Sequence, residues 1–283
     1  GVLKTTGFEL QAKWSDKLAN GLRYSVGVAL SDDKAKVVSY PSNPTNSIGD
    51  GKLYKGFTVG DIWGYETGGI LQEGDFDGVG ANGKPLYHGP YFKGGQAYPG
   101  YVWYQDLNHD GVITGGLGTV DNPGDRKVIG NNAPRYRYNI TANVQYKGFD
   151  LDVMFQGVGK RDYWLSSSSS YWGGGAGSWE TYNDSWTPER TNAKFPMYGY
   201  GLGSYTQSGY LLDASYIKLK QVILGYTFPK NMINKIGLEK LRLNIAAYNL
   251  FTISDVPKYY DSDYISDAYP PKRTFSVGIQ VGF

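Results

Sequence analysis

The sequence predicts an all-β protein made of antiparallel strands, and three observations support this fold class. Apolar and polar residues alternate with a period of two in seven segments, as in strands that have one apolar face. Glycine and tyrosine are abundant, with 40 and 26 copies in 283 residues, which fits many turns and aromatic-rich strands. Only residues 230–237 read as helical, over about two turns.

The clearest alternation lies in residues 135–146, where apolar side chains occupy one face and polar side chains the other. Lys147 and Gly148 then form a tight turn, and residues 149–156 repeat the pattern. These two segments are predicted to form a β-hairpin with one apolar and one strongly polar face. On the polar face, Arg137 and Asp152 are expected to pair across the hairpin.

Five further segments alternate less regularly and bring the total to seven strands. A change of parity within residues 216–229 predicts a β-bulge near Gln221. The other four strands are expected at residues 8–14, 22–30, 241–247 and 275–283. The polar face of the sheet would carry Arg135, Arg137, Asn139, Asn143, Asp150, Asp152, Arg242 and Asn244.

The lengths of the connections favour a transmembrane β-barrel over a soluble β-sandwich. Short links at residues 16–20, 147–148 and 229–237 alternate with long ones at 31–134, 157–212 and 253–272. Outer-membrane barrels sort their connections into short periplasmic turns and long extracellular loops, whereas sandwiches have no reason to do so. We therefore expect an antiparallel barrel in the bacterial outer membrane, with its apolar face in lipid and all long loops outside.

Strand parity adds two expectations. Complete bacterial barrels have an even number of strands, so seven strands form an incomplete arc, and we expect residues before Gly1 and the remaining part of the same barrel. For the same reason residues 54–72 cannot add a single span. They are loop structure or pair with a segment such as residues 98–105.

Composition excludes several classes of function. The chain has no cysteine, two histidines and a net charge of +2 without a basic stripe, so thiolate zinc sites and nucleic-acid binding are not expected. No motif of a hydrolase, metalloprotease or phosphate-binding loop is present, and no enzymatic activity is expected. Asp261 and Asp263 read as an exposed pair of loop carboxylates rather than a glycosidase dyad.

Several segments, spread through nearly the whole chain, resemble the C-terminal part of SusC/RagA-type outer-membrane transporters of Bacteroidetes, which are TonB-dependent receptors. As a set they are specific, and they occur in the order found in that family. They are WGYET at residues 63–67 followed by Gly69-Ile70, YQDLNHDGVIT at 104–114, DRKVIGN at 125–131, PRY at 134–136, GFDLDVMFQG at 148–157, SWTPER at 185–190, YIKLKQVILGYTFP at 216–229, YNLFT at 248–252 and the strand that ends in Phe283.

The resemblance implies a barrel of about 22 strands with an N-terminal plug and a TonB-contacting segment, neither of which is visible in this sequence. It also implies TonB-driven import of oligosaccharides or peptides, a SusD-like surface lipoprotein as lid, and a dimer of transporter–lid pairs. Phe283 would occupy the place of the terminal aromatic residue that the barrel-assembly machinery reads. The same residue could also be simply the last lipid-facing side chain of its strand.

Residues 106–113 have the ligand spacing of a calcium loop. Asp106, Asn108 and Asp110 would supply side-chain oxygens, Gly111 the sharp turn, and Val112 its carbonyl oxygen. The twelfth position is Leu117, which cannot bind a cation, so Asp121 or Asp125 would have to close the site, and Asp125 is favoured because in relatives the closing acid likewise precedes an arginine. The alternatives are structural Ca²⁺, or a similar hard cation, and a metal-free turn rich in Asp and Asn.

Aromatic residues gather in residues 163–186, within one of the long loops. Flat aromatic rings among polar neighbours stack on sugars or grip peptides, so this cluster predicts contact with a substrate or with the lid. Trp164 and Trp172 could instead belong to an aromatic belt at the membrane interface, and the others could pack loop against loop. The residues assigned to this contact are Trp164, Tyr171, Trp172, Trp179, Tyr182 and Trp186.

Two other architectures are compatible with the alternation alone. A secreted, soluble β-sandwich could bind glycans through the tryptophan-rich loops, and a small self-contained barrel could serve a structural role. Extraction without detergent would distinguish the sandwich, because only a soluble protein would enter the aqueous fraction.

Overall fold

The computed structural model describes residues 1–283 except 50, 166–178, 200–204, 259 and 266–270. The chain divides into two compact units. The first comprises residues 1–5, 35–133 and 162–212, and the second comprises residues 6–34, 134–161 and 213–283. Each unit is described here by itself.

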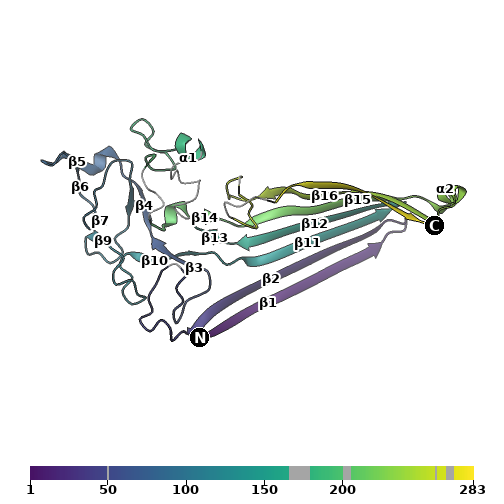
Figure 1. Ribbon diagram of the computed structural model, residues 1–283, viewed down its shortest axis with the longest axis horizontal. Helices are drawn as coiled ribbons and strands as arrows, with labels where there is room; N and C mark the ends of the chain where they lie inside the picture. The colour runs from purple at the N-terminus through teal and green to yellow at the C-terminus, as the bar shows by residue number, and fades with distance from the viewer. Residues whose placement is uncertain (50, 166–178, 200–204, 259, 266–270) are drawn as a thin grey trace. The chain divides into compact units, whose positions relative to one another are not determined.

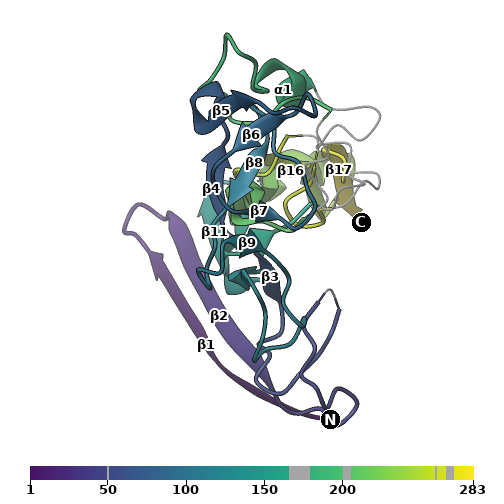
Figure 2. The same ribbon diagram turned by 90° about the vertical axis from the view of Figure 1, so that its left-hand side faces the viewer.

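A seven-stranded sheet forms most of the second unit, and its strands lie side by side in chain order (Figure 1). The pairs from β2 to β17 are antiparallel. Among the described residues, β1 and β17 pair on one side only, so the sheet is open at both edges; Figure 2 shows β1 beside β2. The strands are β1 (Val2–Lys17), β2 (Arg23–Ser39), β11 (Arg135–Tyr146), β12 (Phe149–Lys160), β15 (Tyr216–Thr227), β16 (Lys240–Ile253) and β17 (Thr274–Gly282).

All seven predicted strands and the predicted bulge are confirmed, whereas β2 extends through residues 31–39, which were assigned to a long connection. Lys147 and Gly148 both have positive φ, 46° and 89°, as a two-residue hairpin turn requires. Against β12 the pairing of β15 slips between Leu219 and Gln221, so Lys220 is the extra residue there. Against β16 it slips at the same place, where residues 249 and 250 both stand opposite Lys220. After β15 the chain forms the short helices α2 (Lys230–Ile233) and η5 (Asn234–Ile236), as expected for residues 230–237.

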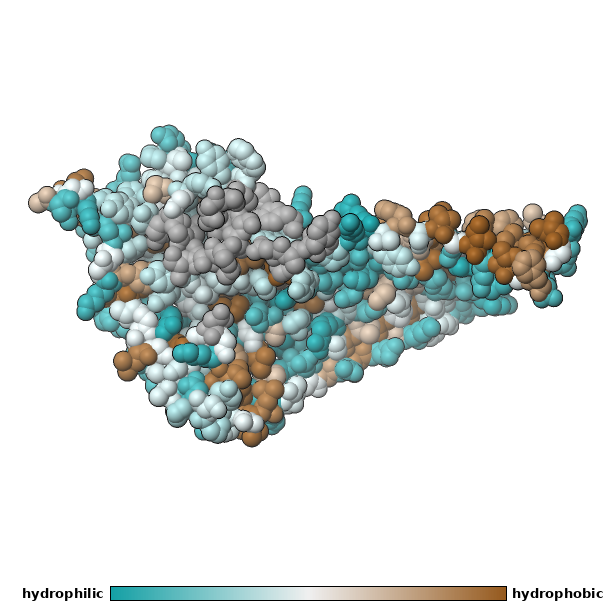
Figure 3. Space-filling model, in the orientation of Figure 1, coloured by the Kyte–Doolittle hydropathy of each residue, from teal (hydrophilic) through white to brown (hydrophobic). Residues whose placement is uncertain are grey.

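One face of the sheet is apolar and uncovered. Val277 and Ile279 of β17 are 78% and 68% exposed, and Ile245 opposite Val277 is 56% exposed. Figure 3 shows hydrophobic residues gathered where β16 and β17 lie. A sandwich has a second sheet over such a face, and among the described strands outside these seven none belongs to a sheet of more than two strands.

The opposite face is polar, and its charged side chains pair with one another. On this face Arg242 reaches across β15 to Asp150 with Nη2–Oδ2 of 2.5 Å. At the start of β11, Arg135 binds Asp32 through two hydrogen bonds of 2.5 Å. Arg242 can cross β15 because residue 225 is a glycine. A Cβ at this position would lie 2.4 Å from the Arg242 guanidinium.

The expected Arg137–Asp152 pair is wrong. The hairpin turn fixes the register, which sets Arg137 opposite Val158 and Asp152 opposite Asn143. Arg137 therefore pairs with Asp33 of β2, and Asp152 accepts a 2.6 Å hydrogen bond from the Asn143 amide.

The first unit is built from short strands and two-stranded sheets around an aromatic core. β4 pairs with β8, so residues 54–72 do find a partner in residues 98–105, as expected. β3 pairs with β10, β5 with β6, and β7 with β9, the last in parallel. The elements are β3 (Asp61–Tyr65), β4 (Thr67–Ile70), η1 (Glu73–Asp75), β5 (Phe76–Val79), β6 (Pro85–Tyr87), β7 (Tyr91–Phe92), β8 (Val102–Tyr104), β9 (Val112–Ile113), β10 (Arg126–Asn131), β13 (Asp162–Tyr163), α1 (Trp179–Asn183), η4 (Ser208–Tyr210) and, at the boundary of the units, β14 (Leu212–Asp213), which pairs with β13.

The aromatic core explains why this unit holds together with so little regular structure. Tyr65 packs edge-on against Phe92, Tyr104 and Tyr205, and Phe92 stacks on Tyr205 at 4.3 Å. Burial raises the pKa of the Tyr104 phenol, whose hydroxyl accepts a hydrogen bond from the fully buried Gln207. No helix in the described part of the chain has both the length and the hydrophobicity to cross a membrane.

Candidate functional site

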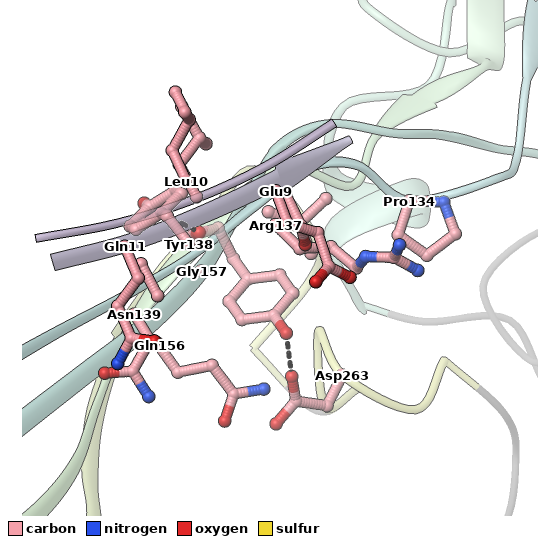
Figure 4. Close-up of a pocket in the computed structure, with 15 residues that line it drawn as sticks. Glu9, Leu10, Gln11, Pro134, Arg137, Tyr138, Asn139, Gln156, Gly157 and Asp263 are labelled. Atoms are coloured by element: carbon pink, nitrogen blue, oxygen red, sulfur yellow. Dashed lines mark hydrogen bonds between the residues drawn. The ribbon is translucent and has the colours of Figure 1, made fainter. Parts of the chain in front are cut away.

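The polar face of the second unit carries an open hollow of about 890 Å³, which we call the polar hollow (Figure 4). Strand register places Asn139, Gln156 and Lys218 in one row across β11, β12 and β15, and Arg137, Val158 and Tyr216 in the next. All of these residues except Lys218 line the hollow, and they form its floor. The charged and amide side chains that line the hollow are those of Glu9, Gln11, Arg137, Asn139, Gln156 and Asp263.

The lining offers mixed hydrogen-bonding chemistry. Gln11, Asn139 and Gln156 each carry an amide that can donate and accept, and Arg137 adds a guanidinium that remains half exposed beside Asp33. Glu9 and Asp263 supply acidic groups. Such a surface can bind ligands rich in amide or hydroxyl groups, such as peptides or oligosaccharides, without a strong preference for net charge.

Hydrogen bonds from two tyrosines, Tyr138 and Tyr216, connect the strands and the segment around the hollow. Tyr138 crosses β12 and donates a 3.2 Å hydrogen bond to the Tyr216 carbonyl oxygen on β15. The crossing requires Gly157, because a Cβ there would lie 2.3 Å from the Tyr138 ring. The Tyr216 hydroxyl in turn donates to Asp263.

A group of charged residues, which we call the Lys218 cluster, joins the floor to the segment between β16 and β17. Lys218 is 1% exposed, and its ammonium lies 2.9 and 2.8 Å from the two Asp261 carboxylate oxygens and 2.8 Å from Asp263. Lys220 approaches the same Asp263 oxygen at 3.3 Å. The expectation that Asp261 and Asp263 are merely exposed is therefore wrong, because their side chains are only 13% and 22% accessible and both hold Lys218.

The pKa of Asp263 gives an expected pH dependence. Burial raises this pKa, but the Lys218 ammonium and the Tyr216 hydroxyl outweigh burial and hold it below its ordinary value. Its ion pairs therefore add stability above the unfolded pKa of about 4, and this stability is lost as the pH falls through the lower folded value. We expect hydrogen exchange of amides 260–265, corrected for the intrinsic rate, to stay constant from pH 7 to about 5 and to rise only below about pH 4.

The predicted calcium loop closes on itself through hydrogen bonds. Asp106 accepts from the backbone N–H groups of Asp110 and Gly111, at 3.3 and 2.8 Å. Asp125 returns to the loop, fully buried, and accepts from Leu107 N–H at 2.9 Å and Thr114 N–H at 2.7 Å. The other candidate, Asp121, is exposed. Asn108 and Asp110 join the same turn, and Val112 opens β9.

Calcium binding at this loop stays a prediction. Across the described residues no three His, Asp or Glu side chains are grouped so as to hold a metal ion, and the loop oxygens already accept backbone hydrogen bonds. Carboxylate oxygens have further lone pairs with which they can bind a cation. If Ca²⁺ binds, Asp106→Ala will lower the calcium content of the purified protein by about one ion. Elemental analysis checks this, and an unchanged content would refute the assignment.

The predicted aromatic contact residues separate into three groups. Trp179 and Tyr182 lie on α1, are 76% and 54% exposed, and pack edge-on against each other. Trp186 is 3% exposed, donates its indole N–H to Gln72 at 2.9 Å and packs on Gly100, so it belongs to the interior of the first unit. Trp164 is half-buried, and Tyr171 and Trp172 lie outside the described residues.

Sequence reasoning missed the Lys218 cluster and one exposed aromatic residue. Tyr198 is 42% exposed and lies 5.2 Å from Tyr182, which extends the aromatic surface of α1. For the Lys218 cluster, the sequence carries one indication. Lys218 occupies a strand position that faces the polar side of the sheet, and two acidic residues, Asp261 and Asp263, lie in the next long connection.

Comparison with known proteins gives the following relatives. No family model matches the chain. Over 311 aligned residues the chain is 27% identical to TonB-dependent receptor P3 of Formosa agariphila, an alignment that covers all of this chain and 29% of the relative. TonB-dependent receptor P26 of the same organism is 27% identical over 199 residues, covering 64% of this chain and 19% of the relative.

Solved structures agree on the fold. The chain matches the RagAB peptide importer in its open-open state with a TM-score of 0.69 and 17% identity, over 99% of this chain and 29% of that one. The closed-closed state gives a TM-score of 0.62 at 16% identity. The predicted resemblance to a portion of a SusC/RagA-like TonB-dependent transporter is confirmed, and the chain spans less than a third of the length of these relatives.

Proposed function

We propose that this chain is part of a TonB-dependent importer of the bacterial outer membrane, of the SusC/RagA type, which takes up peptides or oligosaccharides. One observation carries the proposal: a two-faced antiparallel sheet with an uncovered apolar side, in a chain similar over its whole length to part of TonB-dependent receptors. In this function the apolar face meets lipid, and the polar face, with the polar hollow, lines the passage. The relatives are receptors and importers by name, which points to a role other than catalysis.

The partners follow from the same proposal. The matched solved structures are of RagAB, a peptide importer. This similarity supports a lipoprotein partner of the SusD kind for this protein. TonB would engage a part of the protein outside this sequence and supply the energy. A dimer of transporter–lid pairs is the assembly we expect, with the exposed rings of Trp179, Tyr182 and Tyr198 facing the substrate or the lid.

A membrane fractionation and an uptake measurement test the function. We expect the intact protein in the detergent-soluble outer-membrane fraction, and its deletion should abolish growth on an oligopeptide or an oligosaccharide that exceeds the size limit of general porins. Growth measured separately on oligopeptides and on oligosaccharides decides which of these two substrate classes the protein imports. Recovery of the protein in the aqueous fraction without detergent, or normal growth of the deletion strain on both classes, would contradict the proposal.

A further inference from the structure

We infer that the Lys218 cluster is a latch that holds residues 260–265 over the polar face of the sheet and so narrows the passage beside the polar hollow. The cluster consists of Tyr216, Lys218, Lys220, Asp261 and Asp263, all within the second unit. The position of the latch follows from the structure, whereas its effect on a passage rests on the proposed transporter function.

The first step is the direction of Lys218. It lies opposite Gln156 on β12, which lies opposite Asn139 on β11, and residues directly opposite in neighbouring strands share a face. Lys218 therefore points to the polar face, next to the floor of the hollow. The carboxylates that bind it must lie above that face, which places residues 261–263 over the sheet.

The second step is that Lys218 depends on this segment. A lysine is almost never fully buried without a partner, because its charge loses water. Here Asp261 offers both oxygens and Asp263 one, all between 2.8 and 2.9 Å. With Lys220, the cluster contains two cations and two anions, so its charges balance. Removing the segment would take away the three carboxylate oxygens that hold the ammonium.

The third step is that the segment is built to stay in place. Asp261 also accepts the backbone N–H of Asp263 at 2.8 Å, which shapes the turn that presents both carboxylates. Ser262 between them is 4% exposed, and the neighbouring Tyr260 and Ile265 are 8% and 6% exposed. Asp263 lines the polar hollow, so the same residue closes the latch and forms a wall of the cavity.

A cysteine at position 262 reports whether the latch is closed, because this chain has no cysteine of its own. In the intact protein in detergent, Ser262→Cys should react slowly with a maleimide, and protein with the natural Ser262 gives the background. Adding Lys218→Met, which keeps the length and removes the charge, should raise the labelling rate on the order of 100-fold, because a buried ion pair is lost. Asp261→Asn is the milder second variant and should raise the rate less.

Lys220→Met is the matched control. It touches the same carboxylate but is 37% exposed, so it should change the labelling rate by less than about fivefold. Equal effects of the two lysine variants, or unchanged labelling in Lys218→Met and Asp261→Asn protein that still migrates as folded, would overturn the latch.

A second readout tests the narrowing of the passage. Cells that carry Lys218→Met should become more sensitive to a large antibiotic that the outer membrane normally excludes, and Lys220→Met cells should not. Faster labelling without this sensitivity would refute the narrowing and leave the latch standing. Failure of the proposed function would differ from both results, because it would show in unaltered protein as absence from the outer membrane.

Discussion

A lysine in place of Val277 is expected to lower the share of the protein that folds into the outer membrane. Val277 lies in the middle of β17, is 78% exposed and faces Ile245 across the apolar side of the sheet. A lysine on the lipid face costs about 2–4 kcal/mol near the bilayer midplane and less near the interfaces. A cost of that size lowers the ratio of folded to unfolded protein by about 30-fold or more. Heat-modifiable migration of the outer-membrane fraction on a gel measures the folded share.

Gln280→Lys provides the control on the same strand. Gln280 lies opposite Arg242 on the polar face, where a charged group meets water rather than lipid. This variant should fold nearly as well as the unaltered protein. Equal losses in the two variants would show that β17 does not separate lipid from water, and the lipid-facing assignment would then be wrong. Normal folding of Val277→Lys would have the same meaning.

Strand segments with one apolar face could be predicted from the sequence, whereas the parts of the same strands that lack such a face could not. The hairpin at residues 135–156 was predicted almost to its ends because apolar and polar residues alternate without a break. β2 runs on to Ser39, well past the predicted end at residue 30. A strand of 17 residues spans about 56 Å, whereas the apolar band of an outer membrane is about 25 Å tall. The part of a strand outside this band has no need to alternate, so the sequence carries no signal for it.

The pairing of individual side chains was harder to predict. The turn at residues 147–148 determines every pair in the hairpin, and applying it would have set Asp152 against Asn143 instead of Arg137. The Lys218 pairs are different in kind, because they join a strand to a segment 43 and 45 residues away. No local periodicity reports such contacts, which depend on where a long connection folds.

The strands of the first unit could not be predicted from alternating apolar and polar residues. Its strands have two to six residues and lie around an aromatic core, so no alternation develops along them. Resemblance to relatives, rather than periodicity, selected Asp125 as the residue that returns to the loop at 106–113. The structure adds the physical reason for its position, since its buried carboxylate accepts two backbone N–H groups of the loop.

Asp125→Ala is therefore expected to loosen the first unit strongly. The substitution leaves the N–H groups of Leu107 and Thr114 without their acceptor, at about 1–3 kcal/mol for each unsatisfied group. A loss of about 3 kcal/mol would raise the hydrogen-exchange rate of these amides roughly 100-fold, provided they exchange through local opening. Exchange measured by mass spectrometry on the intact protein is the suitable readout, because large proteins do not unfold in a single step.

Two comparisons decide what Asp125 does for the loop. Asp121→Ala removes an exposed acid nearby and should leave exchange unchanged, whereas Asp125→Asn keeps one acceptor oxygen and should have an intermediate effect. EDTA then separates the two interpretations of the loop. If hydrogen bonds alone close it, EDTA will not change exchange at Leu107 and Thr114. If Ca²⁺ closes it, EDTA will reproduce part of the Asp125→Ala effect in the unaltered protein, because binding of the ion stabilises the folded loop.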